Sequence, residues 1–132
     1  YVELANIGTA LLDLTGLRFS DGIEFTFPAM ELAPGECVVV VDDPVAFRAE
    51  YGTEVRVAGQ YSGRLSDKGE DIVLTLAEPF DAAIARFRYD ESWHPATDGG
   101  GLALTVDDPA AAPAAWNRPE SWRASAPSPG RL

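Results

Sequence analysis

Hydrophobic and polar residues alternate along several short stretches of the chain, which is the pattern of strands that bury one face. In one of these stretches Ile23, Phe25 and Phe27 share a face, while Glu24 and Thr26 occupy the other. The alternating stretches are residues 2–6, 11–19, 23–27, 71–77, 84–89 and 102–106. Many short strands separated by glycine-containing turns predict an all-β sandwich.

Two segments depart from this alternation. The sequence CVVVV, which begins at Cys37, is apolar on both faces and predicts a central strand. The following segment DDPVAFRAEYG has Asp43 as a helix N-cap, Pro44 in the first turn and Gly52 as a stop signal. We therefore expect one short helix in a crossover connection between two strands.

Composition narrows the classes of partner. The chain has 132 residues, of which 46% are hydrophobic, and this fits one folded domain without disulfides. Its net charge of −11 repels nucleic-acid phosphates and anionic membranes, so neither is expected as a partner.

The part after about Pro109 is rich in alanine and proline and should be irregular, although Trp116 and Trp122 predict that some of it packs on the sandwich. The final residues 125–132 are typical of a linker.

The sole histidine, His94, lies in the loop YDESWHPATDGGG. A catalytic triad with Ser92 and Asp90 or Asp98 would crowd all its members into one short loop, whereas triads converge from separate segments. A cysteine–histidine pair with Cys37 would need a nucleophile from an apolar strand, where a thiol behaves as a small hydrophobe. The glycine run precedes a strand pattern and not a phosphate-binding helix. We interpret the loop as structural, and expect no enzymatic activity and no cofactor.

Acidic residues near the expected strand ends leave one alternative open. Calcium binds several oxygen ligands at once, and no EF-hand spacing is present. A calcium-dependent binding domain, or a hydrolase domain using these acidic loops, would require the carboxylates to converge around an open cavity. The candidate calcium ligands are Asp42, Asp43, Asp90, Asp98, Asp107 and Asp108.

Five blocks of the sequence, in order, resemble the lamin tail domain family. They are YVELANIGTALLDLTGLRFSDGIEFTFP, LAPGECVVVVDDPVAFRAEYG, GQYSGRLSDKGEDIVL, YDESWHPATDGGGLALTVDDP and WRASAPSPG. Together they cover nearly all of the chain. The resemblance implies an immunoglobulin-like β-sandwich over residues 1–124, followed by the linker.

The resemblance also implies a function. It suggests a non-catalytic module that binds a protein or a polysaccharide and tethers a neighbouring domain. It favours the bacterial branch of the family, in larger proteins that are exported to the cell envelope or outside the cell. The loop around His94 is similar to a connection typical of the family, and we expect Trp93 in it to cap one end of the sandwich. The family has a strand ahead of the one that begins near Val2, so the resemblance further implies an open sheet edge that could accept a strand from another molecule, including a second copy.

Overall fold

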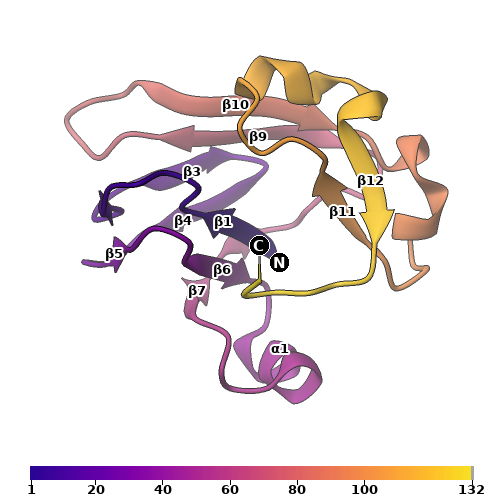
Figure 1. Cartoon of the computed structure of the whole chain (residues 1–132), viewed down its shortest axis with the longest axis horizontal. Coiled ribbons are helices and arrows are strands. Elements are labelled where there is room, and N and C mark those ends of the chain that lie inside the picture. The colour runs from indigo at the N-terminus through magenta and orange to yellow at the C-terminus, as the bar shows by residue number, and fades with distance from the viewer. Residues whose placement is uncertain (132) are drawn as a thin grey trace.

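The computed structural model describes residues 1–131 and is an all-β sandwich with one short α-helix (Figure 1). One sheet is three-stranded, in the order β1 (Val2–Ala5), β6 (Cys37–Val41), β7 (Val57–Gln60). The facing sheet is five-stranded, in the order β10 (Ala83–Tyr89), β9 (Glu70–Thr75), β3 (Arg18–Asp21), β4 (Ile23–Thr26), β8 (Ser62–Gly63). The predicted all-β sandwich is confirmed, and the finer immunoglobulin-like assignment stays a prediction.

Two small ribbons and four 3-10 helices complete the chain. The ribbons are β2 (Leu12–Asp13) with β5 (Glu31–Leu32), and β11 (Ala103–Val106) with β12 (Trp122–Ser125). The 3-10 helices are η1 (Glu91–Trp93), η2 (Pro95–Thr97), η3 (Pro113–Asn117) and η4 (Pro119–Ser121).

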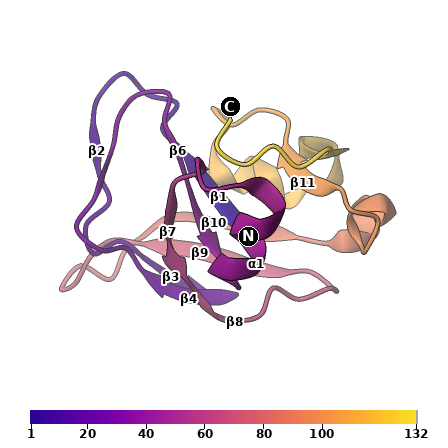
Figure 2. The same ribbon diagram turned by 90° about the horizontal axis from the view of Figure 1, so that it is seen from below.

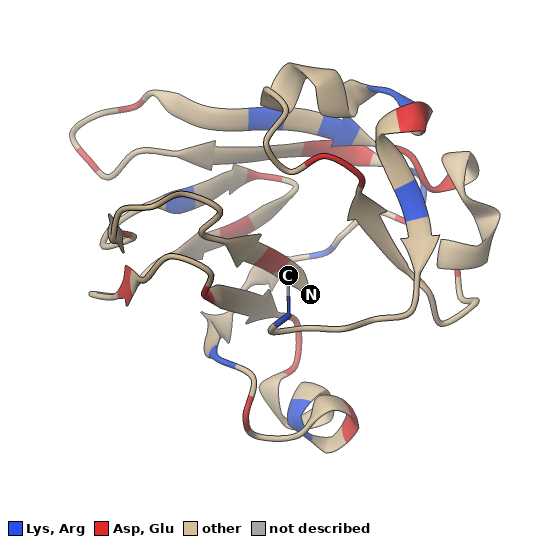
Figure 3. Cartoon of the chain, viewed as in Figure 1, with Lys and Arg blue, Asp and Glu red and all other residues tan. Residues whose placement is uncertain are grey.

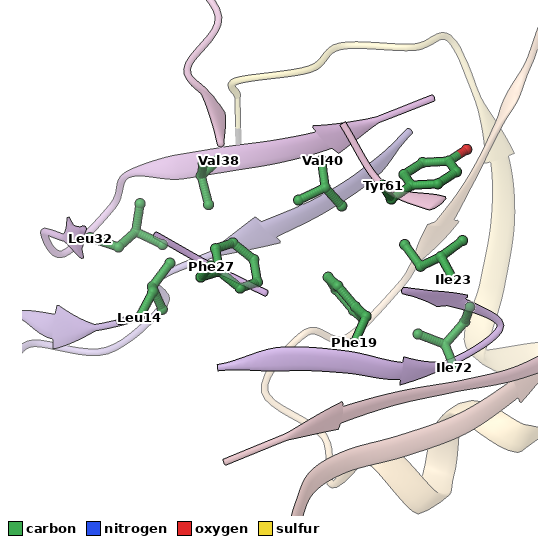
Figure 4. Close-up of a cluster of buried hydrophobic side chains, with 9 residues drawn as sticks. All are labelled: Leu14, Phe19, Ile23, Phe27, Leu32, Val38, Val40, Tyr61 and Ile72. Carbon is green, nitrogen blue, oxygen red and sulfur yellow. The ribbon is translucent and has the colours of Figure 1, made fainter. Parts of the chain in front are cut away.

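The main core lies between the two sheets (Figure 4). The alternation read from the sequence fills it: Ile23 and Phe27 of the β4 region are 1% and 2% exposed, and they meet Val38 and Val40 from β6. Burying such side chains stabilises the fold by about 1.5–3 kcal/mol each, before entropic costs.

Strand β6 is buried along its whole length because it is covered on both faces. Val38 and Val40 face the five-stranded sheet, whereas Val39 and Val41 face Phe47 on the helix α1 (Pro44–Tyr51). Figure 2 shows α1 beside this sheet. The helix joins β6 to β7, which are parallel and so require a crossover. The central strand and the crossover helix are both confirmed.

The C-terminal part is more ordered than its composition suggested. Trp116 and Trp122 each pack against Phe87 of β10, with ring centroids 5.5 Å apart, so the predicted packing of the tail is confirmed. The expectation of an irregular tail is wrong at β12, which pairs with β11 and includes Ser125. Pairing with β11 supplies the backbone partners that local sequence does not reveal. No helix within residues 1–131 combines the length and apolar character needed to cross a membrane.

Candidate functional site

The loop around His94 is built from local turns. The Asp90 carboxylate accepts a hydrogen bond from the backbone N–H of Ser92 at 2.9 Å and so caps η1. Hydrogen bonds from Ser92 hold the pKa of Asp90 below its usual range. The His94 imidazole Nε2 lies 3.4 Å from the carbonyl of Pro119, while Asp98 ends η2. The Asp90 carboxylate and the His94 ring, which a triad would need to face each other, therefore each contact backbone groups instead.

Cys37 and His94 belong to different parts of the sandwich. Cys37 lies in β6 of the three-stranded sheet and is 8% exposed, whereas His94 follows β10 of the five-stranded sheet. Burial raises the pKa of the Cys37 thiol, which keeps it in the less nucleophilic neutral form.

Four of the six calcium candidates use their carboxylates to cap turns or to pair with an arginine, namely Asp43, Asp90, Asp107 and Asp108. The Asp43 carboxylate accepts from the backbone N–H groups of Val45 and Ala46, and Asp107 pairs with Arg123 at 2.6 Å. Asp108 accepts from a backbone N–H two residues on, while Asp42 uses its backbone carbonyl to accept from Gln60. Within residues 1–131 no three His, Cys, Asp or Glu side chains are grouped in a way that could hold a metal ion.

Two shallow hollows open on the surface. One, of about 260 Å³, lies between α1 and the start of β1, and Asp42, Asp43 and Tyr1 contribute to its lining. The other, of about 670 Å³, lies beside β4 and β7 and includes Phe25 and Gln60. Neither hollow is lined by the His94 loop, so neither brings the candidate histidine together with the acids.

The outer edge of β1 carries backbone groups that no neighbouring strand pairs. In an antiparallel pair, residues alternate between bonding their partner strand and pointing away from it. Asn6 donates to the carbonyl of Glu36 on the β6 side at 2.9 Å, which places Leu4 and Val2 in the bonded set. Glu3 and Ala5 therefore direct their N–H and C=O groups outward, and within residues 1–131 these groups have no backbone partner.

The other edges of the two larger sheets are interrupted. The register of β10 shifts between Ala83 and Ala85, and its far end is covered where Asn117 accepts from the N–H of Arg88 at 2.6 Å. The register of β7 against β6 also shifts, and β8 has only two residues. Bulges and short strands are the usual ways in which edges are kept from pairing. The β1 edge, in register with β6 throughout, has neither.

Sequence reasoning did not find one further surface. The end of the β9–β10 hairpin exposes Leu76 and Phe80 in the connection and Ile84 at the start of β10. The sequence does contain a signal for this surface, since a phenylalanine is unusual in a loop that is exposed to solvent.

Comparison with known proteins gives no identification. No family model matches the chain, and neither a curated protein nor a solved structure matches it. The resemblance to the lamin tail family therefore stays a prediction.

Proposed function

We propose that the chain is a non-catalytic binding module that adds an extended segment of a partner protein to the open edge of β1. The single observation that carries this proposal is the unbroken β1 edge, where Glu3 and Ala5 direct their backbone groups away from β6. A regular edge of this kind is a template for strand addition.

In strand addition the backbone groups of the edge supply affinity for the partner segment, and the neighbouring side chains supply selectivity. The outward N–H and C=O groups of Glu3 and Ala5 would bind the main chain of the partner segment. The side chain of Tyr1 packs on Phe47 and Tyr51, and the Glu3 carboxylate accepts a hydrogen bond from the N–H of Gly130. These groups border the edge and would contact the side chains of the partner that lie on the same face.

The proposal about the larger protein that contains this module rests on the resemblance to the lamin tail domain family alone. A place in a larger exported bacterial protein, in which the module tethers a neighbouring domain, is part of the proposal. Because four of the six candidate carboxylates cap turns or pair with an arginine, no specific observation favours the calcium-dependent or hydrolytic alternative.

The test is a proline substitution at the proposed edge. Ala5→Pro removes an outward N–H without breaking a bond to β6, and proline is tolerated on strand edges. Thr26→Pro is the matched control. The Phe27 N–H bonds to Leu17, just before β3, so the Thr26 N–H is directed away from β3, past the β4 residues that β8 pairs. Both variants are first compared with the wild type by melting temperature.

The probe is a phage-displayed library of random linear peptides selected on the wild-type protein. We expect selected peptides to bind the Thr26→Pro variant like the wild type and to bind Ala5→Pro at least tenfold more weakly. Amide exchange at Glu3 and Ala5 should slow in the bound state. Equal binding to both variants, or a selection that yields no binding peptide, would overturn the proposal.

A further inference from the structure

The turn between β9 and β10 carries an exposed apolar surface. Leu76, Phe80 and Ile84 are 39%, 67% and 47% exposed, although they lie within nine residues of sequence. Scattered exposed hydrophobic residues need no explanation, but three of them at one end of a β-hairpin point to an interaction surface. We call Leu76, Phe80 and Ile84 the apolar tip.

The apolar tip lies at one end of the molecule. Figures 1 and 2 both show the β9–β10 turn at the far left of the long axis, away from the C-terminal ribbon β11–β12. A partner can therefore reach it without displacing another element.

Long-range contacts hold this turn in one shape. Arg18 of β3 reaches across the sequence to the Asp81 carboxylate at 2.6 Å and to the Glu78 carboxylate at 3.7 Å. Within the turn, the N–H of Leu76 donates to Ala82 and the N–H of Phe80 donates to Ala77, each at 3.0 Å. A surface already fixed in this way loses less conformational entropy when it binds.

The charges around the apolar tip select the chemistry of the partner. Glu78 and Asp81 are 88% and 85% exposed on either side of Phe80, and Arg18 pairs with both. Figure 3 shows acidic positions in the β9–β10 turn and a basic position on the neighbouring strand. The whole chain carries −11, so a second copy or an anionic membrane would be repelled. A partner with Lys or Arg around an apolar pocket would instead be attracted.

We propose that the apolar tip inserts Phe80 into an apolar pocket of a partner protein whose rim is basic. Phe80 is the anchor, because large aromatic side chains dominate the energy of such interfaces. Glu78 and Asp81 contact the basic rim and raise the rate of association. This surface is separate from the β1 edge, so the chain would hold two partners or two parts of one partner.

The test is site-specific photo-crosslinking in the cells that make the protein. The photoreactive amino acid p-benzoylphenylalanine replaces Phe80 in one variant and Val45 in the control. Val45 lies on α1 and is 78% exposed, more than Phe80, so it controls for exposure alone. We expect a discrete adduct with another protein from position 80 that is absent from position 45.

The partner identified in this way is then purified and its affinity measured. Phe80→Ser should weaken binding at least tenfold, with an unchanged melting temperature because the side chain is exposed. Added salt should also weaken binding, and Ala5→Pro should leave it unchanged, which separates this proposal from the one at the β1 edge. The proposal is overturned by the absence of an adduct from position 80, by identical adducts from both positions, by an adduct with lipid or a second copy, or by an affinity that does not depend on Phe80.

Discussion

Asp43 distinguishes a helix cap from a calcium ligand, since the two roles respond differently to the same substitution. Its carboxylate oxygen accepts hydrogen bonds from the N–H groups of Val45 and Ala46 at 2.8 and 3.0 Å. Asp43→Ala removes both bonds and the favourable charge at the start of α1. Phe47, one turn further on, stays packed on Val39 and Val41. The damage should therefore be confined to the first turn.

The size of the effect follows from the exposure of the cap. Because Asp43 is exposed, water replaces part of the lost bonding, and the free energy of unfolding should fall by about 1 kcal/mol. Unfolding entropy of roughly 2.1 cal/mol/K per residue amounts to about 0.28 kcal/mol/K for this chain. The expected loss of free energy divided by this unfolding entropy predicts a melting temperature about 4 °C below that of the wild type.

The assay is thermal unfolding of four proteins, each with calcium and with chelator. Asp43→Ala should melt about 4 °C below the wild type in both buffers. Asp43→Ser should recover most of the loss, since serine also caps helices. Asp42→Ala is the neighbouring control, because that residue accepts from Gln60 through its backbone and should change little. Calcium should leave the wild-type melting temperature unchanged.

A calcium site at this position would give the opposite pattern. The wild type would then melt several degrees higher with calcium, as binding to the native state requires. Asp43→Ala would lose that increment and match the wild type in chelator. Either result would refute the assignment of Asp43 as a cap alone.

Three further predictions concern stability and reactivity. Burial, and after it the nearby charge of Glu70, raises the pKa of Tyr89 well above its usual range. The protonated hydroxyl therefore stabilises the folded state below about pH 10, and this contribution to the free energy of unfolding is lost as the pH rises further. Urea unfolding at about pH 9 and 11 should show that decline, and Tyr89→Phe should reduce it; an identical decline in the variant would contradict the assignment. Val39→Ala should cost about 2.5 kcal/mol, from two lost methyl groups and the cavity that they leave, because Val39 is 0% exposed. Trp93→Ala should cost less, since Trp93 is half-buried and outside both core clusters, and a larger loss for Trp93 would show that the loop supports the core. The Cys37 thiol should react with a thiol reagent only as fast as the protein unfolds, and rapid labelling in native buffer would refute its burial.

The candidate sites were less accessible to sequence reasoning than the fold. Acidic residues near strand ends suggested calcium, but an acid in a loop can cap a turn, pair with an arginine or bind a metal. Asp43 caps α1 and Asp107 pairs with Arg123, sixteen residues away in sequence. Which of these roles an acid takes depends on neighbours that the fold supplies.

The local structure of this protein could be predicted from its amino-acid order alone. Alternation placed Ile23 and Phe27 in the core, the unbroken apolar run marked β6 as central, and Asp43 with Gly52 bounded α1. These features follow from side-chain periodicity and from backbone preferences, which act over a few residues. Three other features emerge from long-range packing alone: which strands lie at sheet edges, the pairing of β12 with β11, and the contact of Arg18 with a turn sixty-three residues away. Such contacts depend on how the sheets pack. The backbone of a strand can form hydrogen bonds with many other strands, and an arginine can pair with many acids, so the packing of the chain determines which partner lies within reach.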